Sequence, residues 1–132
     1  MKAVHVSGKR KRAIARATLT KGKGTIRINS LALEAYNPRM AQLMIQEPLT
    51  LAGDLAKKVD INIKVKGGGW HSQADAVRLV VAKALLEHSG SEALKKTFLD
   101  YDRHLLVADT RRTEPSKPND SKPRAKRQKS YR

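Results

Sequence analysis

Apolar and polar residues alternate most clearly over residues 59–66, where four full periods predict a strand with one apolar face. The glycine triplet at residues 67–69 ends this strand. From about Ser72, apolar residues recur three and four positions apart, as on one face of a helix. Gly90 is expected to end that helix, because glycine adopts the left-handed conformation common at helix C-termini. The middle of the chain is therefore predicted to be a strand, a glycine turn and an amphipathic helix.

Two shorter β-prone runs, residues 14–19 and 25–28, flank a loop that contains Gly22 and Gly24. Glycines permit the positive φ that tight hairpin turns need. We therefore predict that these two runs pair with each other as a basic hairpin.

Helix signals follow this predicted hairpin. Asn29 or Ser30 is predicted to cap a short helical turn, because both side chains accept hydrogen bonds from free backbone N–H groups. Pro38 suits the first turn of a second helical segment, which is predicted to continue through residue 46 and to end at Pro48.

The C-terminal third begins with a further predicted helix, from about Ser91 to Leu99. Residues 105–107 are expected to dock on the core as a last strand or turn, and the core is expected to end at Asp109. These elements predict an α+β fold, with one globular domain over residues 1–109 and an extended basic tail over residues 110–132. Prolines in the tail make its backbone resistant to helix formation.

The charge balance points to a polyanionic partner. The 132 residues include 28 Lys and Arg against 12 Asp and Glu, a formal net charge of +16. From Arg111 onward, nine basic residues stand against Glu114 and Asp120, so the tail alone carries +7. Self-repulsion of this size is best tolerated when phosphates neutralise it. The tail is too polar to fold alone and is expected to take its order from that partner.

Several classes of protein are excluded. The chain has no cysteine, which rules out a disulfide framework and thiolate zinc sites. No apolar stretch approaches the roughly 20 residues needed to span a bilayer, and the N-terminus lacks the apolar region of a signal peptide. We therefore expect an intracellular, cytoplasmic protein with no membrane partner.

The basic motif at residues 8–13 allows two interpretations. A run of Lys and Arg is often a solvated loop, and in other settings it is a nuclear localisation patch. We favour RNA contact, because the run abuts a predicted strand that would hold its side chains on a rigid element. Aromatic residues make up only 4% of the chain, which disfavours a single-strand module built on base stacking.

Enzymatic chemistry has little support in the sequence. The glycine triplet before a helix is compatible with a structural turn, with contact to RNA phosphate, or with a nucleotide-cofactor site. It lacks the Lys-Ser/Thr of a P-loop and the spaced glycines of a dinucleotide fingerprint. The carboxylates are scattered, and the four histidines lack the spacing of a metal site. We expect no catalytic residue, metal, cofactor or small-molecule substrate.

Six short motifs follow one another along the whole chain. They are Gly8-Lys9-Arg10-Lys11-Arg12-Ala13, Gly22-Lys23-Gly24, Val65-Lys66-Gly67-Gly68-Gly69, Asp102-Arg103, Arg111-Arg112 and the terminal Gln128-Lys129-Ser130-Tyr131-Arg132. In order and spacing these motifs resemble the family of the ninth universal protein of the small ribosomal subunit. The ending resembles the archaeal and eukaryotic branch of that family.

The resemblance implies a four-stranded sheet with helices packed on one face and a left-handed βαβ crossover. It implies a structural role in the head of the small subunit, with small-subunit rRNA and neighbouring head proteins as partners. It also implies that the end of the tail contacts peptidyl-site tRNA during translation. The alternative is a general basic nucleic-acid-binding protein or RNA chaperone outside the ribosome, which the same charge would serve.

The candidate site residues fall into two groups. Those expected to bind rRNA are Lys9, Arg10, Lys11, Arg12, Arg16, Lys23, Lys66, Gly67, Gly68, Gly69, Arg78, Arg103, Arg111, Arg112, Arg124, Lys126 and Arg127. Those expected to contact tRNA, as the resemblance implies, are Lys129, Ser130, Tyr131 and Arg132.

Overall fold

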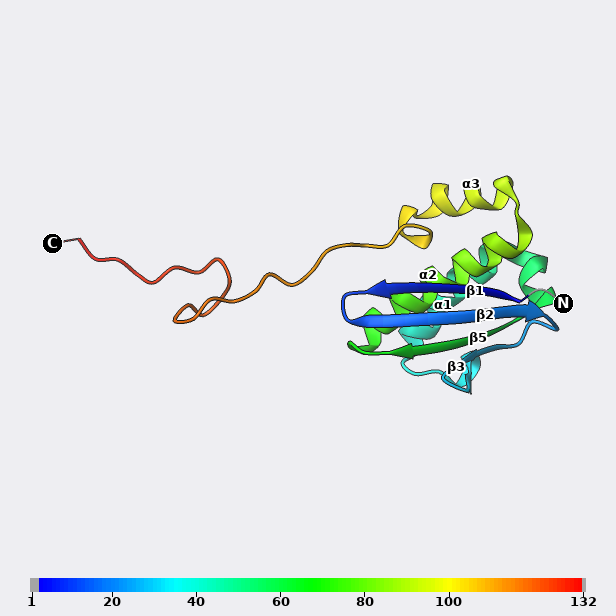
Figure 1. Ribbon diagram of the computed structural model, residues 1–132, viewed down its shortest axis with the longest axis horizontal. Helices are drawn as coiled ribbons and strands as arrows, with labels where there is room; N and C mark the ends of the chain where they lie inside the picture. Colours follow the sequence, from blue (N-terminus) through cyan, green and yellow to red (C-terminus); the bar gives the residue numbers. More distant parts are fainter. Residues whose placement is uncertain (1–2, 132) are drawn as a thin grey trace.

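The structure is a computed structural model that describes residues 3–131, and it confirms an α+β fold (Figure 1). Its strands are β1 (Val4–Arg10), β2 (Ala13–Lys21), β3 (Ile26–Ile28), β4 (Leu31–Ala32) and β5 (Val59–Lys66). Its α-helices are α1 (Arg39–Ala52), α2 (Trp70–Ser89) and α3 (Glu92–Tyr101). Short 3-10 helices cover η1 (Leu33–Ala35), η2 (Gly53–Lys58) and η3 (Arg103–Leu105).

The five strands form one sheet in the order β1-β2-β5-β3-β4. The prediction of four strands is wrong by one, because two residues after a tight turn, Leu31–Ala32, pair back onto β3 as the edge strand β4. β5 is antiparallel to β2 and parallel to β3. The connection from β3 to β5 runs through α1, and its left-handedness stays a prediction of the resemblance.

The predicted hairpin between residues 14–19 and 25–28 is wrong, because β5 lies between β2 and β3. The loop between these strands instead crosses the beginning of β5. Gly22 donates to the Lys58 carbonyl oxygen at 2.9 Å, and Gly24 donates to that of Val59 at 3.1 Å. The true hairpin joins β1 to β2, and the prediction missed β1 altogether.

Asn29 does not cap a helix as predicted. It has a positive φ of 50° and its side-chain amide pairs with the backbone of Val65, donating at 3.0 Å and accepting at 2.9 Å. This contact extends the pairing between β3 and β5 by one residue. Ser30 also has a positive φ, of 70°, so the two residues form the turn into β4.

The first long helix begins near the predicted place but ends later. Pro38 is the residue that precedes α1, and the helix continues past Pro48 to Ala52. Proline removes one hydrogen bond from a helix interior. Burial of Pro48 against the protein interior offsets that loss, so the local rule that proline ends a helix gives the wrong boundary here.

The strand, turn and helix predicted from residue 59 onward are confirmed. β5 covers Val59–Lys66 with strict alternation of buried and exposed residues, and α2 follows directly after the glycine triplet. Gly90 ends α2 in the left-handed conformation. Ser91 caps α3 by accepting a hydrogen bond from the Leu94 N–H. Beyond α3, the predicted last strand or turn is a turn, the 3-10 helix η3 that buries Leu105.

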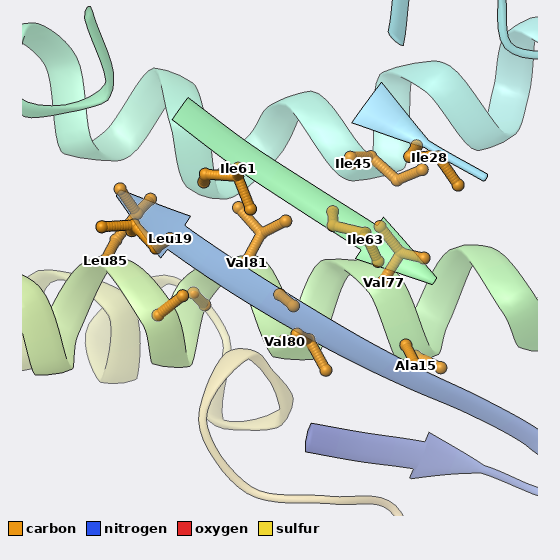
Figure 2. Close-up of a cluster of buried hydrophobic side chains, with 14 of the residues drawn as sticks. Ala15, Leu19, Ile28, Ile45, Ile61, Ile63, Val77, Val80, Val81 and Leu85 are labelled. Atoms are coloured by element: carbon orange, nitrogen blue, oxygen red, sulfur yellow. The ribbon is translucent and has the colours of Figure 1, made fainter. Parts of the chain in front are cut away.

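Helices α1 and α2 lie behind the sheet in Figure 1, so one face is covered by helices. Apolar side chains from β2, β5, α1 and α2 fill the space between the layers (Figure 2). Small residues let α2 approach closely. A Cβ atom on Gly8 would lie 2.9 Å from side-chain atoms of Leu79 and of Val80. The core is therefore thin, and it depends on close contact between β1, β2 and α2.

Candidate nucleic-acid interface

The basic motif of residues 8–13 forms the end of β1, a two-residue turn and the start of β2. Lys11 and Arg12 occupy the turn and are exposed. The glycine triplet packs beneath it, since a Cβ atom on Gly67 would lie only 2.5 Å from the Arg12 carbonyl oxygen. Gly67 also has a φ of 81°, which favours glycine. Two predicted sites thus form one basic corner.

The glycines of this corner have different roles. Gly67 and Gly68 are close to the β1–β2 turn and have positive φ, as a structural turn requires. Gln73 supports the turn by donating to the Gly67 carbonyl oxygen at 3.1 Å. Gly69 has open space around its Cα and precedes the N-terminus of α2. Of the three glycines, Gly69 is therefore the most accessible to a phosphate group.

A second group of predicted residues lies on the face of the sheet that the helices leave uncovered. We call this the open sheet face, and its outward side chains are His5, Ser7, Lys9, Ile14, Arg16, Thr18, Thr20, Arg27, Asp60, Asn62, Lys64 and Lys66. Of these, Lys9, Arg16 and Lys66 were predicted to bind rRNA. Arg27 and Lys64 lie on the same face but were not among the predicted residues. The alternation over residues 59–66 already places Lys64 on the same polar side as Lys66, so that pattern could have found it.

Negative charge is scarce near the open sheet face. Asp60 is the one acidic residue among the strands of the described chain. Its carboxylate accepts hydrogen bonds from the backbone N–H groups of Thr25 at 2.8 Å and Lys23 at 2.9 Å. These two bonds, that of Thr25 first, lower the pKa of Asp60 below its ordinary value. Asp60 therefore fixes the β2–β3 loop, which also carries the predicted residue Lys23.

Arg10 points toward the helices, unlike its neighbour Lys9. Its guanidinium lies 3.4 Å from a carboxylate oxygen of Asp109 and 3.8 Å from one of Asp75. It also donates to the Arg111 carbonyl oxygen at 3.1 Å. Arg111 in turn donates from its Nε and Nη2 atoms to Asp109, and its side chain and backbone N–H hold the pKa of that carboxyl well below the usual range. We call these residues the tail root.

Arg78 is also committed to carboxylates. It extends from α2 and donates to Glu47 of α1 at 2.6 Å and to Asp102, just after α3, at 3.1 Å. Burial raises the pKa of Asp102, but hydrogen bonds from the His104 N–H and from Arg78 outweigh it, so the net shift is downward. Arg78 therefore links three helical segments, and its charge is largely neutralised inside the protein.

The remaining predicted residues are exposed and lie apart from one another. Arg103 is in η3, and Lys23 is at the opposite end of β2 from the basic corner. Beyond Leu105 the described chain has no helix or strand, and Figure 1 shows it leaving the body on the side of the β1–β2 turn. In this segment Arg124 pairs with Glu114 at 3.0 Å. The other predicted tail residues are exposed, including Arg112, Lys126, Arg127, Lys129, Ser130 and Tyr131. Arg132 lies outside the described residues.

Neither a cluster of metal-ligating side chains nor a membrane-spanning helix is found among the described residues. Within residues 3–131, no three His, Asp or Glu side chains gather as a metal ion would require. His71 lies 3.3 Å from Asp75, which is a pair rather than a metal site. None of the helices in this part of the chain is long and apolar enough to cross a bilayer.

Known proteins are similar in sequence to this chain over nearly its whole length. A family profile described as Ribosomal protein S9/S16 matches residues 8–132. The protein called Small ribosomal subunit protein uS9 from Methanococcus vannielii is 53% identical over 134 residues, which cover all of both chains. Its counterpart from Methanococcus maripaludis strain C7 is 54% identical with the same coverage. The similarity thus includes the basic corner, the sheet and the tail, and the chain belongs to the S9/S16 family of ribosomal proteins, in its archaeal form.

Proposed function

We propose that this protein is a structural component of the head of the small ribosomal subunit, in cytoplasmic ribosomes. It binds rRNA through its basic surfaces, contacts neighbouring head proteins and performs no covalent chemistry. The observation that carries this proposal is the similarity to archaeal relatives over the whole length of both chains, tail included. The net charge of +16 gives the physical basis, since phosphate neutralisation drives binding of such a chain to RNA.

The basic corner and the tail are the parts best suited to rRNA. Lys11 and Arg12 are exposed on a structured turn, so they can bind phosphates without a further cost of backbone ordering. Tail residues such as Arg112 and Lys126 are exposed on a backbone without regular structure, and they can follow an RNA surface. Arg10 and Arg78, predicted to bind rRNA, contribute mainly by holding the body and the tail root in place.

We propose further that residues 110–132 work as a separate arm whose end contacts peptidyl-site tRNA. Fully extended, the residues from Arg111 onward reach on the order of 70 Å, enough to leave the body. Lys129 and Arg132 would meet tRNA phosphates, while Ser130 and Tyr131 hydrogen-bond or stack beside them. Tyr131 is 90% exposed, so its ring is available for such a contact.

Sedimentation tests the ribosomal role. The tagged chain is followed in a magnesium-containing gradient of native extract, with and without high salt and RNase. We expect stoichiometric, salt-resistant migration with small subunits that RNase abolishes, because cooperative assembly resists screening better than loose phosphate attraction. Smeared binding that salt dissolves would favour the general nucleic-acid-binding protein instead.

Charge removal at the end of the tail tests the tRNA contact. The variant Lys129→Gln/Arg132→Gln is compared with Lys117→Gln/Lys122→Gln, which removes the same charge from the middle of the tail. We expect weaker binding of peptidyl-site tRNA to small subunits carrying the first variant, and near-normal binding with the second. Equal affinities in a filter-binding assay would show that the end of the tail does not contact the tRNA.

A further inference from the structure

Two cations of the open sheet face lie close enough to repel each other in the free protein. In the register of β2 and β5, Arg16 lies directly opposite Lys64. Cβ atoms of such cross-strand partners are about 5 Å apart, and like charges there are destabilising. Lys66 and Arg27 add charge on the same face, at either side of this pair. The pair therefore opposes folding slightly unless a partner with negative charge lies on it.

No group of the described protein neutralises this pair. Neither Arg16 nor Lys64 takes part in an ion pair within residues 3–131, whereas Arg10 and Arg78 each have two carboxylate partners. Asp60, on the same face, is already bound to the β2–β3 loop. The missing negative charge must come from outside the described chain.

The surface over this pair is hollowed, and polar side chains lie between the cations along it. Two adjoining depressions, of about 750 and 460 Å³, share Arg16, Asn29, Ser30 and Lys64 along their linings. The larger one is also lined by Thr18 and Asn62 and by no acidic residue. Hydroxyl and amide groups between cations are the donors and acceptors that sugar 2′-hydroxyls and phosphates use.

The open sheet face carries one ring, that of His5, whose Nδ1 lies 3.1 Å from the Thr18 hydroxyl oxygen. Its outward side chains include no Phe, Tyr or Trp among the described residues, and Ile14 is its one large apolar side chain. Proteins that bind single strands on a sheet stack bases on exposed aromatic rings. A-form duplexes are recognised instead by their shape, their phosphates and their 2′-hydroxyls. The composition of the open sheet face fits the second mode.

We propose that the open sheet face is a docking surface for the backbone of double-helical RNA, with Arg16, Lys64 and Arg27 at phosphates and Asn62 beside the sugars. This inference rests on the proposed ribosomal function and names a surface for its rRNA contact. The basic corner, which adjoins this face at Lys9, and the tail would then bind RNA beyond it, so the body is held at more than one place.

Two triple variants of the full chain test the proposal. Arg16→Gln/Arg27→Gln/Lys64→Gln removes three charges from the open sheet face, and Lys58→Gln/Lys83→Gln/Lys96→Gln removes three from other elements. Each is titrated with a 20-base-pair RNA duplex, a DNA duplex of the same sequence and a single-stranded oligouridine. We expect the open-face variant to lose about tenfold or more in affinity for the RNA duplex, with a salt dependence shallower by about 2 to 3 in log–log slope.

The control variant has the same net charge, so it should keep most of that affinity. Equal losses in the two variants would overturn the proposal and leave only non-specific attraction. A larger loss on oligouridine than on the duplex would also overturn it, in favour of single-strand binding. A second readout uses the unmodified protein: Lys64 should be acetylated more slowly in the duplex complex than free, while Lys96 should not change. Unchanged acetylation of Lys64 would contradict the docking surface.

Failure of this proposal differs from failure of the ribosomal function. If both triple variants bind the duplex equally and the unmodified chain still sediments with small subunits, the docking surface is wrong and the proposed function stands. If the unmodified chain does not sediment with small subunits, the proposed function is wrong, and the docking surface loses the premise on which it rests.

Discussion

The two faces of the sheet are made by alternate residues of the same strands, yet they have opposite chemistry. On β5, Ile61 and Ile63 are buried under the helices, while Asn62 and Lys64 are exposed on the open side. The covered face derives its stability from apolar packing. The open sheet face contributes little to packing and keeps positive charge available. The difference shows that one strand can serve both the fold and the proposed RNA-docking surface.

The arginines of the globular body also differ between the two sides of the sheet. Arg10 and Arg78 lie on the helix side and are 14% and 13% exposed, each held by two carboxylates. Arg16, on the open sheet face, has no carboxylate partner among the described residues. Whether an arginine of the body is paired with carboxylates thus depends on the face that it occupies.

The largest effect is expected from truncating the covered face. Ile61→Ala should lower the free energy of unfolding by about 2–5 kcal/mol, because Ile61 is fully buried and its removal leaves a cavity. The adjacent change Asn62→Ala, on the open side, should stay within about 0.5 kcal/mol. Urea denaturation of both variants measures the contrast. Similar losses would mean that the open side also carries the fold.

The second largest effect is expected from Arg78→Ala, which should lower the free energy of unfolding by about 2 kcal/mol. The loss is smaller than for a fully buried ion pair, because Glu47 and Asp102 are about a third exposed. The change would leave both carboxylates without their cation. Arg16→Ala, on the open side, serves as the control and should not destabilise the fold.

This arginine also predicts a pH dependence. The pKa of Asp102 is lowered in the folded state, so its contribution is present above the ordinary aspartate range and is lost as pH falls through the lowered value. The stability gap between the unmodified chain and Arg78→Ala should therefore narrow as the pH falls from neutral toward about 3. A gap that stays constant would mean that packing of the arginine stem, not its charge, stabilises the helices.

The sequence predicted an element correctly where the whole signal for it lay within that element or at its ends. The alternation in β5, the glycine that ends α2 and the helix that follows from about Ser91 were all predicted correctly. Strand β1 was missed, although Val4 and Val6 alternate with polar residues, because Gly8 interrupts the pattern. Gly8 is there for close contact with α2, which a local pattern does not show.

The other wrong predictions concern strands and ion pairs whose partners are far apart in the sequence. The parallel partners β3 and β5 are separated by all of α1, so the sequence favoured a local hairpin that the fold replaces. The carboxylates that neutralise Arg78 come from residues 31 positions before it and 24 after it. Nothing near Arg78 in the sequence distinguishes it from an arginine that faces RNA.

The tail root offers a more local test. Asp109→Asn should leave global stability nearly unchanged but release residues 109–111 from Arg10, so that trypsin cleaves after Arg111 several-fold faster. Because the pKa of Asp109 is lowered, the contact is fully present above the ordinary aspartate range and is lost only as the pH falls through the lowered value. Asp120→Asn is the matched control, since Asp120 makes no ion pair within the described residues. Equal cleavage rates would show that Asp109 does not anchor the tail.

The smallest effect has the opposite sign. Lys64→Gln should raise the free energy of unfolding by about 0.2–1 kcal/mol, because it removes a like charge directly opposite Arg16. Lys66→Gln, on the same strand and face but opposite Ile14, should change it less. The gain should shrink with added salt as screening weakens the repulsion.

A double-mutant cycle locates the source of that gain. Arg16→Gln and Lys64→Gln relieve the same repulsion, so together they should stabilise the protein by less than the sum of the two single changes. Additive gains, or equal gains for Lys64→Gln and Lys66→Gln, would rule out the cross-strand pair as the cause. If the cycle confirms this repulsion, the positive charges of Arg16 and Lys64 lower the stability of the free protein. Such a cost is expected where a surface is shaped for its bound state rather than for the isolated chain.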